Sequence, residues 1–114
     1  MTNTIMLKKN YEFKNLFSKG KFFYGKYIHI YIKKTNSNYN KLGIAISRKQ
    51  GKAVYRNRIK RLIKENYKNF ENEIEKGINI LIVINKEQNI KEINFDNIKE
   101  NFYSTLKKAN VLVK

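Results

Sequence analysis

The stretch of sequence that decides the fold is residues 42–64, which read LGIAISRKQGKAVYRNRIKRLIK. From residue 42 to residue 47, large apolar side chains alternate with Gly, Ala and Ser, so the large ones share one face of a predicted β-strand. From Val54 to about Ile74, apolar residues recur at helical spacing, which predicts a long amphipathic helix. We therefore expect a strand, a short turn and a helix that packs one of its faces.

The predicted helix has an apolar face and a basic face. In a helical projection its apolar side chains, from Ile59 to Phe70, fall in one sector, which we expect to pack. The opposite sector, called the basic face below, carries Asn57, Lys60, Arg61, Lys64 and Lys68. Arg56 projects close to the packed side, so we expect it to brace the helix start or to reach around it.

The flanking sequence supplies the other elements. Residues 27–33 alternate strictly, which predicts a strand with three isoleucines on one face. Its other face carries Tyr27, His29, Tyr31 and Lys33. We also expect a helix at 10–17, a short edge strand at 22–24, a hairpin-like connection at 35–40, a strand buried on both sides at 78–84 and a helix at 95–109. This order predicts one domain over residues 1–114, an α+β sandwich with helices against a mixed four-stranded sheet.

Positive charge is concentrated in the first part of the chain. Residues 1–64 carry 17 Lys or Arg against one acid, a net of +16, whereas residues 65–114 carry 8 against 8. Of the 25 basic residues only four are Arg, and all four lie between Arg48 and Arg61. Arginine offers a planar, bidentate donor that suits phosphate oxygens. The pattern favours nucleic acid over an anionic membrane surface, because the apolar faces are committed to a core.

The composition provides poorly for independent catalysis. One His, one Asp and no Cys exclude a Cys–His pair and a two-histidine ribonuclease centre. The eight acids after residue 64 lack the spacing of a two-metal nuclease. No apolar run is long enough to span a membrane, no signal-peptide core appears, and the lack of Cys fits the cytosol. We expect a cytoplasmic protein that acts on RNA by binding it.

Two features are candidates for RNA contact. At the start of the predicted helix, Arg56 and Arg58 add charge, and Asn57 a polar amide, beside free N–H groups that already favour phosphate. The tyrosine face of residues 27–33, beside small residues of the next strand, would form an aromatic groove with basic edges, suited to unpaired nucleotides. Spacing alone leaves open whether these aromatic side chains form a groove or belong to the core.

These residues carry a resemblance to a known family. Residues 51–65, GKAVYRNRIKRLIKE, closely resemble the signature of the protein subunit of bacterial ribonuclease P, centred on Arg56, Asn57 and Arg58. Residues 42–49 resemble the strand and turn that precede this signature, and residues 7–20 resemble the family's opening helix. Beyond residue 70 the chain agrees only in pattern.

The resemblance implies a cytoplasmic ribonucleoprotein that removes 5′ leaders from precursor tRNAs. A large RNA subunit would carry the chemistry with Mg²⁺, and the small protein would contact that RNA and hold the leader in a cleft between the sheet and the first two helices. The implied fold is αβββαβα, ribosomal protein S5 domain 2-like, with a left-handed βαβ crossover where the general rule predicts a right-handed one. The protein alone is not expected to cleave RNA, and neither a membrane nor an obligate protein partner is expected.

Two sets of site residues follow by position. The expected RNA-binding residues are Arg48, Lys49, Lys52, Arg56, Asn57, Arg58, Lys60, Arg61 and Lys64. The expected leader-cleft residues are Phe13, Phe17, Tyr27 and Tyr31. The sequence departs from the family at Gln50 and Lys52, where an apolar residue and Asn are frequent, and at Lys64, where Arg is common. The alternative hypothesis is a ribosomal or general RNA-binding module with no role in 5′ processing.

Overall fold

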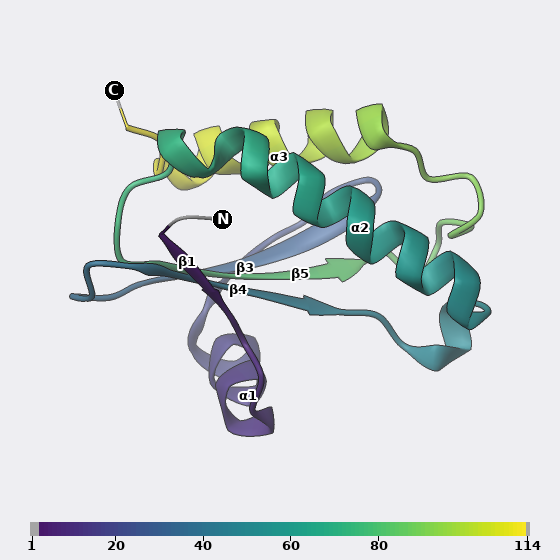
Figure 1. The fold of residues 1–114 in the computed structure, drawn as a ribbon, viewed down its shortest axis with the longest axis horizontal. Coiled ribbons are helices and arrows are strands. Elements are labelled where there is room, and N and C mark those ends of the chain that lie inside the picture. The colour runs from purple at the N-terminus through teal and green to yellow at the C-terminus, as the bar shows by residue number, and fades with distance from the viewer. Residues whose placement is uncertain (1–2, 114) are drawn as a thin grey trace.

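The computed structural model describes residues 3–113, arranged in three layers. One helix lies below a central sheet and two helices lie above it (Figure 1). In chain order the elements are β1 (Thr4–Met6), α1 (Asn10–Lys19), β2 (Lys21–Phe23), β3 (Ile28–Lys34), β4 (Asn40–Ala45), the 3-10 helix η1 (Arg48–Gln50), α2 (Ala53–Phe70), the 3-10 helix η2 (Glu71–Glu73), β5 (Ile78–Ile84) and α3 (Phe95–Ala109). The α+β sandwich expected from the sequence is confirmed.

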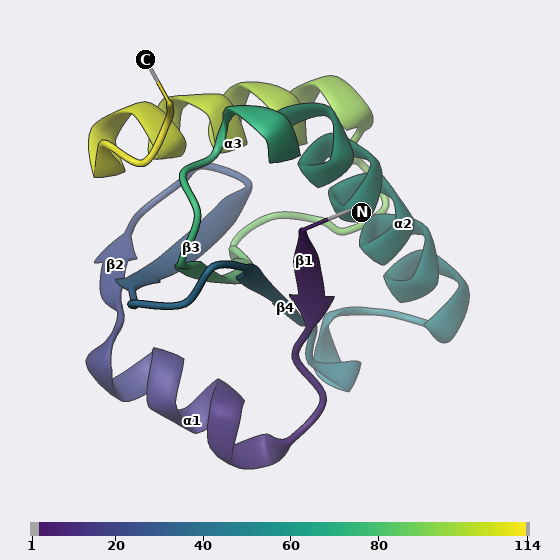
Figure 2. The same ribbon diagram turned by 60° about the vertical axis from the view of Figure 1, so that its left-hand side comes forward.

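The sheet has five strands in the order β1-β4-β5-β3-β2, one more than predicted. The additional strand, β1, pairs in parallel with β4 at the sheet edge and leads directly down into α1 (Figure 2). It is held at one end by Thr4, whose hydroxyl donates to the Glu71 carboxylate at 2.6 Å and shares a hydrogen bond of 2.6 Å with the Tyr67 hydroxyl. Three residues are too few for a periodic pattern, so the sequence did not reveal this strand.

The connection at residues 35–40 does not form the predicted hairpin, because β5 lies between β3 and β4. Strand β5 is antiparallel to β3 and parallel to β4. Its residues are almost all apolar and buried, and only a central position covers both faces of such a strand. The expectation of a strand buried on both sides is confirmed, and it explains why the hairpin prediction was wrong.

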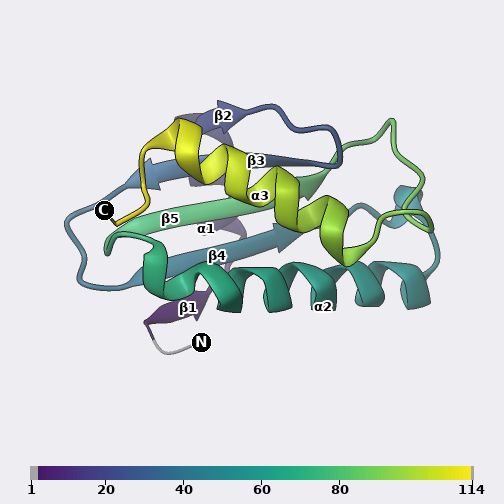
Figure 3. The ribbon, with the colours of Figure 1, turned by 90° about the horizontal axis from the view of Figure 1, so that it is seen from above.

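The β4–α2–β5 unit is a left-handed crossover. In Figure 3, which looks onto the helices, β4 and β5 both run from left to right, α2 lies in front of the sheet, and β5 lies above β4. A right-handed unit seen from this side would place β5 below β4. The handedness implied by the family resemblance is therefore confirmed.

The main core lies between the sheet and the two upper helices. Ile59, Ile63 and Tyr67 of α2 are fully buried against it, and Tyr67 stacks on Phe102 of α3 with ring centroids 6.2 Å apart. Helix α2 ends at Phe70 instead of continuing to Ile74 as predicted. The chain turns through η2, and Ile74 then forms an isolated bridge with Leu112, buried at 4% exposure although it is not helical.

The lower face of the sheet is only partly covered. A small cluster of Leu7, Leu16 and Leu81 joins α1 to the sheet. Close approach depends on Gly43, where a Cβ atom would lie 2.6 Å from Leu7 Cδ1 and 3.0 Å from Phe13 Cε1. Within residues 3–113, no helix is long and apolar enough to cross a membrane. The part of the lower face that α1 leaves uncovered forms the candidate site.

Candidate nucleic-acid interface

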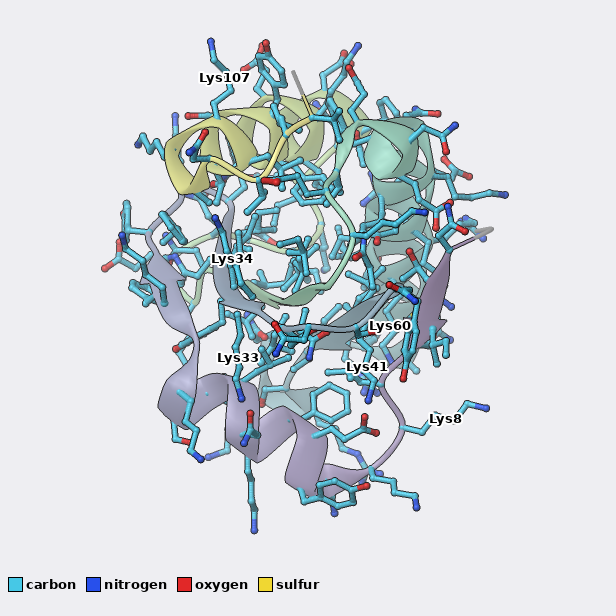
Figure 4. All side chains as sticks on the ribbon, turned by 90° about the vertical axis from the view of Figure 1, so that its left-hand side faces the viewer. Lys8, Lys33, Lys34, Lys41, Lys60 and Lys107 are labelled. Atoms are coloured by element: carbon cyan, nitrogen blue, oxygen red, sulfur yellow. The ribbon has the colours of Figure 1, made fainter. Side chains whose placement is uncertain are left out.

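Two lysines of the sheet hold α1 in its position. The Lys41 ammonium group contacts the Glu12 carboxylate at 3.0 Å, and Lys33 Nζ donates to Asn15 Oδ1 at 2.9 Å. Both side chains extend from the sheet towards α1 (Figure 4). The hydrogen bond from Lys41 holds the pKa of Glu12 below its ordinary value of 4.5. These contacts anchor one side of α1 and leave its opposite side facing an open part of the sheet.

That open part is a hollow of about 890 Å³, called the groove below. It runs from α1 across the lower face of the sheet to α2, and passes the ends of β4 and β5. Its lining residues are Asn10, Phe13, Phe17, Phe22, His29, Tyr31, Ile44, Ala45, Ile46, Ser47, Gln50, Lys60, Val83, Ile84, Asn85, Lys86 and Glu87. The small side chains of Ala45 and Ser47 keep its floor low, as expected from the alternation in residues 42–47.

A continuous row of rings lies along the side of the groove formed by α1, β2 and β3. Phe17 meets Tyr31 edge-on, with ring centroids 5.0 Å apart, and Tyr31 is 5.1 Å from Phe22. Phe22 is in turn 5.2 Å from His29, which is 4.9 Å from Tyr24. The strand register explains the row, because Phe22 pairs directly with Tyr31 across β2 and β3. We call these five residues the aromatic row; four of them line the groove, and Tyr24 lies beyond its rim, where it lines a separate hollow beside α3.

The predicted leader-cleft residues divide among three environments. Phe17 lines the groove and is 45% exposed. Phe13 and Tyr31 also line it, but both are partly buried and pack against the Leu7, Leu16 and Leu81 cluster. The question of core or groove is thus answered residue by residue.

Tyr27 does not line the groove, so the structure does not bring it together with the other three. It precedes β3, packs against the main core and lines a separate hollow beside α3. Its amide donates to Asn101 Oδ1 at 2.8 Å, and its carbonyl accepts from the Asn85 amide at 2.9 Å. The alternation of residues 27–33 extends the strand face by one residue too many, because these contacts redirect the backbone at Tyr27.

The groove also contains residues that were not among the predicted site residues. Phe22 lies on a strand of only three residues, where no periodicity marks its direction. His29 lies on the tyrosine face of residues 27–33, is partly buried, and forms part of the groove lining. Its Nδ1 accepts a hydrogen bond of 3.1 Å from the Gly25 amide. Burial lowers the pKa of His29 below its ordinary value of 6.5, and the nearby Glu87 carboxylate opposes this shift.

The predicted basic residues lie on η1, on the turn after it and on α2, and Lys60 is the one that lines the groove. Arg48 and Lys49 lie exposed on η1, and Lys52 lies exposed immediately before α2. A second hollow runs along α2 and is lined by the basic face together with Glu65. Lys60 lines both this hollow and the groove. The basic face and the aromatic row therefore belong to one continuous surface, which Lys60 joins.

Arg56 and Arg58 lie apart from the exposed basic face. Arg56 is half-buried, and its Nε donates to the Gly51 carbonyl at 3.2 Å, which confirms that it braces the helix start. Arg58 is also half-buried, and its Nη1 atom is buried without a hydrogen-bond partner among the described residues. The structure therefore separates these two arginines from Asn57, Arg61 and Lys64, which are exposed.

The acidic residues do not form a metal centre in the part of the chain that the structure describes. Within residues 3–113, no three His, Cys, Asp or Glu side chains are grouped so as to hold a metal ion. The arrangement is that of a binding surface, with rings, small residues and cations disposed along one face of the sheet.

Known proteins are similar to this chain in sequence and in fold. The family model for Ribonuclease P matches residues 1–110. The chain is 36% identical over 108 residues to the Ribonuclease P protein component of Clostridioides difficile, covering 94% of this chain and 93% of that protein. It is 35% identical over 106 residues to the corresponding protein of Clostridium botulinum, covering 92% and 94%. The structure of the Staphylococcus aureus RNase P protein superposes with a TM-score of 0.82 at 29% identity, covering 95% of this chain and 97% of that one.

Proposed function

The chain belongs to the ribonuclease P protein family, and from this premise we propose that its groove binds the 5′ leader of precursor tRNA while its basic face docks on RNA. As a protein component of ribonuclease P, it partners the ribonuclease P RNA and takes part in the endonucleolytic processing of tRNA 5′ ends. The observation that carries the proposal is the continuity of the two surfaces at Lys60.

The groove has the chemistry that an unpaired leader requires. Phe17 presents an exposed ring, and the partly buried Tyr31 ring lines the groove beside it. Bases stack on such rings, a contact that tolerates any base. Lys60 and Lys86 line the same hollow and attract the phosphate backbone. A groove that binds RNA by stacking on its bases and by attracting its phosphates prefers single strands to a duplex, because the bases of a duplex are already stacked on one another.

The basic surface suits a structured RNA. This surface consists of Arg48 and Lys49 on η1, Lys52 in the turn that follows, and Arg61 and Lys64 on α2. These exposed cations lie on rigid elements, which fixes their spacing before RNA arrives. We propose that they contact phosphates of the ribonuclease P RNA, and that Arg56 acts indirectly by bracing the start of α2.

In this proposal the RNA subunit carries the hydrolysis together with Mg²⁺. Within residues 3–113 no three His, Cys, Asp or Glu side chains are grouped to hold a metal ion, and the proposal gives the Mg²⁺ to the RNA because the family resemblance implies it. The protein's residues bind the leader, orient it and screen its charge. This lowers the concentration of Mg²⁺ that the complex needs, because fewer cations must neutralise the two RNAs.

The decisive experiment combines this protein with ribonuclease P RNA and a precursor tRNA at low Mg²⁺. We expect the protein to raise the cleavage rate at the mature 5′ end, and protein alone to leave the substrate intact. Cleavage by rigorously RNA-free protein would contradict the proposal. RNA binding without stimulation, and without preference for leader-bearing substrate, would instead support a general RNA-binding module.

A further inference from the structure

The aromatic row continues beyond the two rings assigned to the leader. Past Phe17 and Tyr31 it includes Phe22, His29 and Tyr24, each within 5.2 Å of the next ring. Phe22 is 48% exposed and Tyr24 is 65% exposed, so neither ring serves mainly to fill a core. A contiguous exposed aromatic surface at the rim of a groove indicates a binding site.

His29 is held in place within this row by a network centred on Gly25. The Gly25 amide donates to His29 Nδ1 at 3.1 Å, while the Gly25 carbonyl accepts from Asn85 Nδ2 at 3.2 Å. A Cβ atom at position 25 would collide with the Ile28 carbonyl oxygen and the Asn101 side chain, so only glycine fits here. The network ties the end of β5 to the start of β3, and thereby fixes the direction of the histidine ring.

The same network sets the tautomer of His29. Because Nδ1 accepts a hydrogen bond, the neutral ring carries its proton on Nε2. Nothing else within residues 3–113 accepts from Nε2, and the ring lines the groove. His29 therefore offers one flat face for stacking and one free N–H donor at the rim.

The charge around these rings indicates which class of ligand fits the groove. Lys60 and Lys86 line the groove with one carboxylate, Glu87, and the first 64 residues of the chain carry all of its net charge of +16. A polyanion with flat faces and acceptor atoms matches rings, cations and an N–H donor together. Unpaired RNA has all three features, whereas an acidic peptide lacks the stacking faces.

We propose that Phe22, Tyr24 and His29 form a second stacking subsite, which holds unpaired leader nucleotides beyond those held at Phe17 and Tyr31. At this subsite His29 Nε2–H donates to an acceptor atom on a base edge. This inference rests on the proposed function, and it adds a consequence of its own. The affinity of the complex for substrate rises again once the leader is long enough to reach the second subsite.

The test uses the protein assembled with ribonuclease P RNA and a series of precursor tRNAs whose leaders grow one nucleotide at a time. The dissociation constant is measured for the native chain, Phe17→Ala, Phe22→Ala, His29→Val and His29→Phe. Tyr103→Ala is the control, because it removes a ring of similar exposure, 45%, from α3 outside the groove. Thermal unfolding of each variant verifies that it folds.

We expect Phe22→Ala and His29→Val to weaken binding about fivefold or more for long leaders only, as expected for the loss of one stacked base. His29→Phe keeps a ring but no donor, so it should bind long leaders more tightly than His29→Val and discriminate less among bases at that position. Unchanged discrimination in His29→Phe would overturn the assignment of the donor.

The failures of the two proposals are distinguishable. If Phe17→Ala weakens binding while Phe22→Ala and His29→Val match Tyr103→Ala at every length, the second subsite is wrong and the leader groove stands. If Phe17→Ala also matches the control, the leader groove itself is wrong. A loss at Phe22 that is the same for all leader lengths would indicate a structural role and would overturn the subsite.

Discussion

At the scale of single residues, one ion pair sets the position of α1. Glu12 and Lys41 join the helix to the sheet at 3.0 Å, and Glu12 also accepts from the Lys9 amide at 3.3 Å at the start of the helix. The carboxylate therefore fastens α1 to the sheet and also satisfies one of its free N–H groups. The opposite side of α1 carries Phe13 and Phe17, so this pair helps to orient the rings that line the groove.

Glu12→Gln should reduce stability by an amount that depends on pH. The pKa of Glu12 is lowered in the folded protein by Lys41, so its contribution is present above the ordinary value of 4.5 and is lost as pH falls through the lowered pKa. Because the pair is partly exposed, we expect a difference of about 0.2–1 kcal/mol at neutral pH. Urea unfolding of both proteins from neutral to acidic pH measures it.

The difference between the native chain and Glu12→Gln should shrink towards zero in acid. Glu92→Gln, which changes an exposed carboxylate outside the pair, is the matched control and should show no such convergence. A difference that stays constant with pH would mean that the carboxylate acts through shape or hydrogen bonding alone.

How far the sequence predicts a site residue depends on whether one element decides its position. The projection of a single helix placed Arg56 near the packed side, and its bond to Gly51 confirms this. The same projection could not foresee the burial of Arg58 Nη1, which depends on tertiary neighbours. Tyr27 was misplaced for the same reason, because Asn85 and Asn101 redirect its backbone from distant parts of the chain.

At the scale of elements, the accuracy of prediction followed length and amphipathicity. Helix α3 has the predicted bounds, Phe95–Ala109, because its apolar spacing and its Asn94 cap agree. β1 was missed because it depends on a side-chain network between Thr4, Tyr67 and Glu71 that local sequence does not reveal. The hairpin at residues 35–40 was expected from local signals, whereas the burial of β5 decided the strand order.

The contact of α1 with β4 leads to a prediction about Gly43. Its missing side chain leaves room for Leu7 and Phe13, which lie 2.6 Å and 3.0 Å from where a Cβ atom would be. Gly43→Val should push α1 away from the sheet and destabilise the protein by about 1–3 kcal/mol, the usual cost of overpacking. Because Phe13 and Phe17 move with the helix, affinity for leader-bearing substrate should fall more than affinity for the RNA subunit.

A smaller substitution and a compensating one test the cause. Gly43→Ala should have an effect in the same direction but smaller, and combining it with Leu7→Ala should cost less than the sum of the two single changes, because the clash is removed. Denaturant unfolding and leader-binding titrations measure both effects. Strict additivity of the two changes would show that a side chain at position 43 does not compete with Leu7 for the same space.

At the scale of the whole molecule, the fold gathers the positively charged first part of the chain around one surface, which contains both the aromatic row and the basic face. The residues before position 65 build α1, β4, η1 and most of α2, which surround the groove and the basic face. The later residues build β5 and α3, which complete the sheet and core. No local pattern predicts the left-handed crossover, and only the family resemblance pointed to it. Strand β5 lies beside β4, and Lys60 of α2 lines both the groove and the hollow of the basic face.

This separation of charge predicts that salt sensitivity depends on where a cation lies. Arg61→Ala removes an exposed charge from the basic face, so the slope of log affinity against log salt for RNA should flatten by about one unit. Lys107→Ala is the matched control, because Lys107 is exposed on α3 and lines neither the groove nor the hollow of the basic face. It should leave the slope unchanged. Titrations of the RNA subunit at several salt concentrations measure both slopes. Equal flattening in the two variants would mean that RNA senses the net charge of the molecule and not the basic face, because a positioned phosphate contact releases counterions only where it forms.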